Sequence, residues 1–311
     1  MRAFLFPGQG SQAVGMGRDL AAASTVARET LEEVDDALGQ KLSVLMAEGP
    51  EADLTLTANA QPAIMANAIA TLRVMQREGG LDLCAKADAL AGHSLGEYSA
   101  LCAGESFDLA TTARLLRVRG DAMQAAVPVG EGAMAALLGA DLGAAQALCD
   151  AAAECEVLAV ANDNDPTQVV ISGHAAAVER AIAVAKDHDI RRAVKLPVSA
   201  PFHSPLMAPA AEAMRAALEQ HTPRAPRQPV WANVSAAPES DGARIAELLA
   251  EQVTGRVRWR ETIAHMWEAG VTDFVEVGGK VLAPMVKRIA PDASVASIVT
   301  MDDIDAAMAR L

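Results

Sequence analysis

Residues 87–105 restrict the fold more strongly than any other part of the chain. A short apolar run, ADALAG, leads into a turn containing Gly92, Ser94 and Gly96, and the helical segment SLGEYSALCAGE follows. A strand that enters a sharp Gly-x-Ser-x-Gly turn and leaves as a helix presents the serine hydroxyl at the end of a sheet. The start of the helix adds partial positive charge where an oxyanion would form. The stretch predicts an α/β fold with Ser94 as candidate nucleophile; the alternative is a purely structural serine.

Residues 127–199 show a different order of predicted elements. We expect strands at 132–140, 156–163, 168–173 and 191–199, helices at 141–153 and 174–189, and a turn at NDNDPT after the second strand. This β-α-β-β-α-β order within about 70 residues is that of a ferredoxin-like unit. We therefore predict a small ferredoxin-like subdomain at 127–199, inserted into a large α/β domain formed by 1–126 and 200–311.

The large domain is predicted to begin with a strand at 2–6 and to contain a long apolar helix at 61–80. After the insertion, strands are expected at 230–235 and 272–277 because both segments are short, apolar and rich in β-formers. The segment VEVGGKVLAPMVKRI is expected to end the chain as a strand, a Gly-Gly turn and a helix.

Charge and composition exclude several classes of protein. The formal net charge of −14 argues against nucleic acid as a partner. No apolar run approaches the roughly 20 residues of a membrane helix, and the N-terminal apolar stretch is too short for a secretory signal, so we expect a cytoplasmic protein. The cysteines form no C-x-x-C pair, which predicts reduced thiols and no metal site. Local basic groups could still dock an acidic partner, or could be ordinary solvated charges; these are Arg114, Arg117 and Arg119, then Arg191, Arg192 and Lys195, then Lys280, Lys287 and Arg288.

Two further segments could complete a site around Ser94. In FPGQGSQ, Gly8 and Gly10 would let the backbone of Gln9 approach a ligand, and the spacing does not match a phosphate-binding loop. Of the six histidines, His203 lies where the insertion rejoins the large domain, which predicts a cleft. His203 is therefore the candidate general base.

Six motifs follow one another along the chain: FPGQGSQ, AGHSLGEYSAL, VRGDAMQ, ANDNDPTQVVISG, VSAPFHSPLM and VEVGGKVL. In order and spacing they resemble the malonyl-CoA:acyl carrier protein transacylases, over essentially the whole chain. The resemblance implies a hydrolase-like α/β domain with a parallel-rich sheet, interrupted by a ferredoxin-like subdomain. This fold agrees with the order of elements predicted above.

The resemblance also implies roles for the motif residues. Ser94 would be the acylated nucleophile and His203 its base, and the backbone N–H groups of Gln9 and Leu95 would form the oxyanion hole. Arg119 would bind the malonyl carboxylate, since a guanidinium grips a carboxylate through two hydrogen bonds. Without the resemblance, Arg119 would be interpreted as a charge on a helix surface.

Four more residues are predicted to bind substrate with less support from their surroundings. They are Met123 in VRGDAMQ, Asn162 in the predicted turn, Phe202 before the base, and Arg258 in RVRWRE. Arg258 is a departure, because many family members carry glutamine there. The family's histidine is oriented by a backbone carbonyl near this point, so we expect the base to stay oriented and the added positive charge to lower its pKa.

The implied reaction is transfer of the malonyl group from malonyl-CoA to the phosphopantetheine thiol of acyl carrier protein, for fatty acid synthesis. It would proceed through a malonyl-serine intermediate. Malonyl-CoA and the acidic carrier are the implied partners, and no metal or redox cofactor is implied. Charge and composition argue against nucleic acid and a membrane, and we expect a monomer by default. Three alternatives stay open: a serine esterase or thioesterase, an acyltransferase of polyketide synthesis, and a non-catalytic subunit that binds the carrier.

Overall fold

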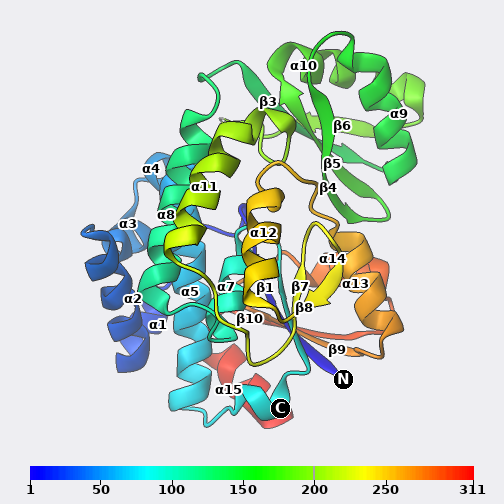
Figure 1. Cartoon of the computed structure of the whole chain (residues 1–311). Coiled ribbons are helices and arrows are strands. Elements are labelled where there is room, and N and C mark those ends of the chain that lie inside the picture. Colours follow the sequence, from blue (N-terminus) through cyan, green and yellow to red (C-terminus); the bar gives the residue numbers. More distant parts are fainter. Residues whose placement is uncertain (199) are drawn as a thin grey trace.

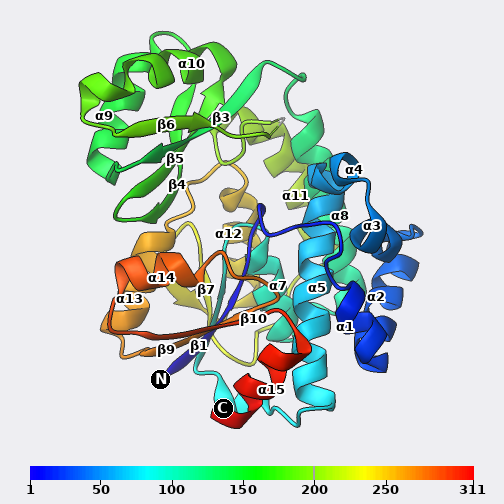
Figure 2. The same ribbon diagram turned by 180° about the vertical axis from the view of Figure 1, so that it is seen from behind.

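The computed structural model describes residues 1–198 and 200–311, and two sheets organise the chain (Figures 1 and 2). The larger sheet has the order β10-β9-β1-β2-β7-β8 and is parallel except for β8, which runs antiparallel to β7. Its strands are β1 (Arg2–Phe6), β2 (Ala89–Gly92), β7 (Val230–Ala232), β8 (Ala237–Glu239), β9 (Asp273–Val277) and β10 (Ser294–Ile298). The parallel-rich sheet predicted for the large domain is confirmed.

Alternating side chains of β1 separate two cores. Phe4 and Phe6 face one core, and Ala3 and Leu5 face the other. The first core is completed by α2 (Thr25–Leu38), α5 (Thr57–Arg77), α7 (Gly96–Ala103), α8 (Leu109–Ala125), α11 (Ala208–Gln220), α12 (Gly242–Gln252) and α15 (Met301–Arg310). The second is completed by α13 (Trp259–Glu268) and α14 (Ala283–Ile289). Shorter helices are α1 (Arg18–Ala23), α3 (Leu42–Glu48), α4 (Glu51–Thr55), α6 (Leu83–Lys86) and η2 (Pro205–Met207).

The smaller sheet lies above the larger one in Figure 1 and is antiparallel throughout, in the order β4-β5-β3-β6. Its elements are β3 (Gly132–Leu138), α9 (Leu142–Ala153), β4 (Leu158–Asp165), β5 (Gln168–His174), α10 (Ala175–Val184), η1 (Ala185–His188) and β6 (Arg192–Lys195). The predicted β-α-β-β-α-β order is therefore confirmed. We propose 127–199 as the subdomain, whose last residue lies outside the described residues.

Two predictions about local structure were wrong. The predicted strand at 156–163 included Asn162, but β4 continues to Asp165, so the predicted turn NDNDPT is too long and the turn is confined to residues 166–167. The chain also does not end with the helix after the Gly-Gly turn, because β10 and α15 follow it. β10 is an edge strand of mostly half-buried small residues, so its apolar alternation is weak. The capping box of Thr300 and Asp303 at the start of α15 was a usable signal in the sequence.

The parallel strands β1 and β2 both end on the side that faces the smaller sheet, whereas the two termini lie at the opposite end of the molecule (Figures 1 and 2). Ligands of α/β sheets bind at the carboxyl ends of the strands, so this side is where a site is expected. Among the described residues, no helix is both long and apolar enough to cross a membrane.

Candidate active site

Ser94 lies in a strained turn that the two glycines of its motif make possible. Its φ angle is 54°, in the left-handed region that non-glycine residues rarely adopt. A Cβ atom on Gly92 would lie 1.9 Å from the backbone of Gly96, and one on Gly96 would lie 2.3 Å from the Phe6 carbonyl oxygen. Only glycine fits at both positions, so the turn lets β2, β1 and α7 converge at the serine.

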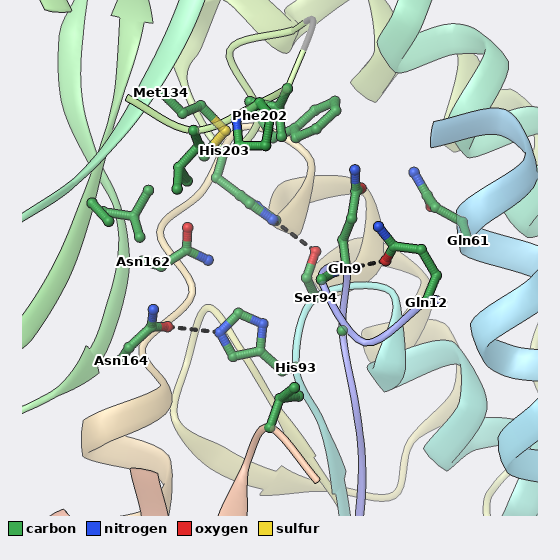
Figure 3. Close-up of a pocket in the computed structure, with 18 of the residues that line it drawn as sticks. Gln9, Gln12, Gln61, His93, Ser94, Met134, Asn162, Asn164, Phe202 and His203 are labelled. Atoms are coloured by element: carbon green, nitrogen blue, oxygen red, sulfur yellow. Dashed lines mark hydrogen bonds between the residues drawn. The ribbon is translucent and has the colours of Figure 1, made fainter. Parts of the chain in front are cut away.

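Ser94, His203 and the end of α12 form a hydrogen-bonded chain, of which Figure 3 shows the contact between Ser94 and His203. The Ser94 Oγ atom lies 2.8 Å from His203 Nε2, and His203 Nδ1 lies 2.8 Å from the backbone oxygen of Gln252. A carbonyl oxygen can only accept a hydrogen bond, so Nδ1 carries the proton and neutral Nε2 presents its lone pair to the serine. The geometry is that of a nucleophile beside an oriented base.

The base is kept neutral by its surroundings. Burial, followed by the charge of Arg119, lowers the pKa of His203 to about 3, although its hydrogen bond to the Gln252 carbonyl acts in the opposite direction. His203 can therefore accept the serine proton at neutral pH.

Acidification is expected to destabilise the wild type more than a His203→Gln variant. Between pH 6.5 and pH 3 the unfolded chain binds a proton at His203 and the folded chain does not, so stability falls as the pH falls. At about 1.4 kcal/mol per pH unit, the wild type should lose up to about 3 kcal/mol more than the variant between pH 6.5 and pH 4. Denaturant unfolding of both proteins across this range measures the difference, and parallel curves would contradict the assignment.

Arg119 is buried within α8 and points at the nucleophile, not at solvent. Its side chain is 1% exposed, and its Nη2 atom lies 3.2 Å from Ser94 Oγ. Nη1 donates to Gln61 Oε1 at 2.7 Å, and Nη2 donates to Gln252 Oε1 at 2.9 Å. Nε is buried and has no partner among the described residues. The interpretation of Arg119 as a surface charge is therefore wrong.

A cavity of about 320 Å³ joins these groups (Figure 3). Besides Ser94, Arg119 and His203, its lining includes the predicted residues Gln9, Met123, Asn162 and Phe202. Leu95 is buried at the start of α7, directly after the serine. In the described chain, neither the Gln9 nor the Leu95 backbone N–H donates to another protein group. Both remain free to bind an incoming oxygen.

Arg258 is a predicted substrate-binding residue that does not line the cavity. Its guanidinium pairs with Glu261 and donates to the backbone oxygens of Val234 and Ser235. The carbonyl that orients His203 belongs to Gln252, at the end of α12. The cation that lowers the pKa of His203 is Arg119, so the expectation for Arg258 was wrong.

Several residues of the site were not predicted. Gln61 and Gln252 hold Arg119, and Asn233 accepts the Ser94 N–H at 2.7 Å and donates to the Gly92 oxygen at 2.7 Å. Gln61 begins the mostly apolar run QPAIMANAIA of α5, and a polar residue in such a run was the available signal, one that Asn67 shares. His93 points away from the serine, and its Nε2 atom lies 2.8 Å from Asn164 Oδ1 (Figure 3).

The predicted basic groups are partly engaged within the molecule. Arg117 donates to Asn59 at 3.0 Å and also to Gln40, Lys195 pairs with Glu179, and Arg288 pairs with buried Asp165. Among the described residues, no group of three or more His, Cys, Asp or Glu side chains is arranged to hold a metal ion.

Comparison with known proteins gives consistent results across the whole chain. The family model described as "Acyl transferase domain" matches residues 3–299. The chain is 45% identical over 289 residues to the malonyl CoA-acyl carrier protein transacylase of Escherichia coli strain K12, covering 92% of each. It superposes with a TM-score of 0.97 on the acyl-carrier-protein-S-malonyltransferase of Bartonella henselae, at 54% identity, with 99% of this chain and 98% of that chain covered. A malonyl-transacylase solved in complex with its type II polyketide acyl-carrier protein has a TM-score of 0.96 and 39% identity, with 100% and 99% covered.

Proposed function

The chain belongs to the acyl transferase family, among the malonyl-CoA:acyl carrier protein transacylases, and we propose that Ser94 and His203 carry out its reaction. The enzyme transfers the malonyl group of malonyl-CoA to acyl carrier protein. The observation that carries the proposed mechanism is the chain of contacts from Ser94 Oγ through the His203 ring to the Gln252 carbonyl.

In the first half-reaction, Ser94 Oγ attacks the thioester carbonyl and its proton passes to His203 Nε2. The N–H groups of Gln9 and Leu95 stabilise the negative charge on the carbonyl oxygen. The C–S bond then breaks, and the coenzyme A sulfur leaves with the proton from His203. The product is a malonyl ester on Ser94.

In the second half-reaction, the phosphopantetheine thiol of the carrier gives its proton to His203 Nε2 and attacks the ester. The C–O bond to Ser94 breaks, and the serine oxygen recovers the proton. No carboxylate touches His203 among the described residues; its Nδ1 partner is the neutral Gln252 carbonyl. A thioester is an activated substrate, so a Ser-His pair with a neutral orienting group is sufficient for this task.

Arg119 supplies selectivity for the malonyl group. Its Nε and Nη2 atoms form one edge of the guanidinium. On that edge, the Nε–H group has no partner among the described residues, and Nη2 contacts Ser94 Oγ. A carboxylate two bonds beyond the reacting carbonyl can bind this edge through two hydrogen bonds. Phe202 and Met123 limit the space left for bulkier acyl groups.

The carrier protein is proposed to dock beside the cavity mouth, where exposed Lys280 adjoins the lining residue Val281. An acidic carrier is attracted to such positive charge. We propose a monomer that uses a carrier of fatty acid synthesis. A carrier of polyketide synthesis is the alternative, since one structural neighbour is a transacylase in complex with such a carrier.

The test is to follow the fate of the malonyl group of malonyl-CoA with and without phosphopantetheinylated carrier. We expect malonyl-carrier as the main product, with carriers of both pathways assayed in parallel. Release of free malonate at the same rate with and without carrier would instead identify a hydrolase. Binding of carrier without any acyl transfer would identify a non-catalytic subunit.

A further inference from the structure

Glu97 is a buried carboxylate that the proposed mechanism does not use. It lies in the first turn of α7, is 2% exposed, and does not line the cavity. Its Oε2 atom accepts the backbone N–H of Asn233 at 3.0 Å and a hydrogen bond from Gln252 Nε2 at 2.8 Å. Both partners also contact Ser94, so Glu97 lies directly behind the nucleophile.

Gln252 connects Glu97 to the selectivity residue. Its Nε2 group donates to Glu97 and to the Ser94 backbone oxygen, at 2.8 Å and 3.0 Å. Because both amide hydrogens are used in this way, Oε1 faces Arg119 and accepts from Nη2 at 2.9 Å. If the carboxamide turned over, its NH2 group would face the guanidinium, with donor against donor. The direction of this one carboxamide therefore decides whether Arg119 has an acceptor there.

Charge supports the same connection. Burial lowers the pKa of Arg119, whereas the Tyr98 hydroxyl and the Glu97 carboxylate act in the opposite direction, and Glu97 lies on the far side of Gln252. Burial raises the pKa of Glu97 to about 7, against the effects of the Asn233 N–H, the Gln252 amide and the Arg119 charge. A carboxylate held in so unfavourable a position while touching no substrate indicates a role in arranging its neighbours.

We propose that Glu97 is a positioning residue for acyl selectivity. It fixes the carboxamide of Gln252, and Gln252 in turn aims Arg119 at the malonyl carboxylate. The inference rests on the proposed function, because it concerns the group that Arg119 binds.

The test compares acylation of Ser94 by malonyl-CoA and by acetyl-CoA, in single turnover, for the wild type and Glu97→Leu. Both donors end on one Glu97 oxygen, Oε2. A leucine at 97 has no acceptor for them, so nothing fixes the direction of the Gln252 carboxamide. The His203 base stays in place because it is held by the backbone of Gln252. We expect the ratio of malonyl to acetyl rates to fall at least about tenfold, as for loss of one hydrogen bond to a charged group.

Two further variants make the result specific. Asp35→Asn changes a carboxylate of α2 that is also buried, bonded to Ser43 at 2.8 Å and 2.7 Å, and remote from the cavity; it should leave the ratio unchanged. Gln252→Met removes the carboxamide but keeps the backbone carbonyl. It should lower the ratio as Glu97→Leu does, and the double variant should lower it no further. Gln252→Met also tests the link if Glu97→Leu does not fold.

The outcomes separate this inference from the proposed function. A wild type that is not acylated at Ser94 would overturn the proposed function. A selective wild type whose ratio is unchanged in Glu97→Leu, whether or not both rates fall, would make Glu97 merely structural and overturn only the inference. A ratio that rises would also overturn it, since it would mean that Glu97 acts only by repelling the malonyl carboxylate.

Discussion

Replacing Ser94 with alanine should abolish the malonyl-enzyme and reduce malonyl transfer by at least about 10⁴-fold, the scale seen when a catalytic nucleophile is removed. The loss is expected because the Oγ atom, 2.8 Å from His203 Nε2, is the atom to which the malonyl group is bonded between the two half-reactions. The Ser94 hydroxyl is not needed to hold the strained turn, because Asn233 and Gln252 bind the backbone of Ser94. The variant should therefore fold normally.

Ser99→Ala is the matched control for this experiment. Ser99 lies on α7, is fully buried, and its hydroxyl has no partner among the described residues. Its removal should leave the transfer rate within about twofold, as for a change that touches no functional group. Stopped-flow or quenched transfer assays measure both variants. Retention of substantial transfer by Ser94→Ala would show that another group is acylated.

Arg119→Ala should reduce malonyl transfer by about 10²- to 10⁴-fold, the range for truncating one partner of a buried charge pair. The malonyl carboxylate would otherwise be buried with no cation to bind it. Acetyl transfer has no such charge and should be affected much less. The measurement is kcat/KM for malonyl-CoA and for acetyl-CoA with wild type and variant.

Arg117→Ala separates selectivity from the general effect of losing an arginine from α8. Arg117 lies two residues before Arg119 but donates to Asn59 and Gln40, outside the cavity. Its loss should affect malonyl and acetyl transfer equally. Equal losses of both substrates in Arg119→Ala would assign Arg119 a structural role and contradict the proposed selectivity.

Ser94 and His203 could be predicted from the sequence because the order of elements places each of them at a junction. Ser94 lies between a buried strand and a helix, and His203 lies where the inserted unit rejoins the large domain. The ferredoxin-like order was equally visible, because its strands and helices are short, regular and separated by clear turns. The carboxyl ends of parallel strands then explain why these residues meet at one side of the sheet.

Gln252 could not be predicted in the same way. It orients the base through its backbone carbonyl, a group that every residue has, so no side-chain pattern in the sequence identifies it. The role of Arg119 also could not be predicted from local spacing, because Arg114, Arg117 and Arg119 together resemble a charged helix face. Arg119 is buried because Gln61 and Gln252, from two other helices, supply acceptors for it. Such long-range partners depend on packing, not on local spacing.

The most direct test of the malonyl-serine mechanism is the intact mass of the enzyme after brief incubation with malonyl-CoA, followed by peptide mapping and then by addition of carrier protein. We expect a single added malonyl group, located on Ser94, absent from Ser94→Ala and removed when the carrier is added. An adduct on another residue, or transfer to the carrier with no adduct at any time, would contradict it.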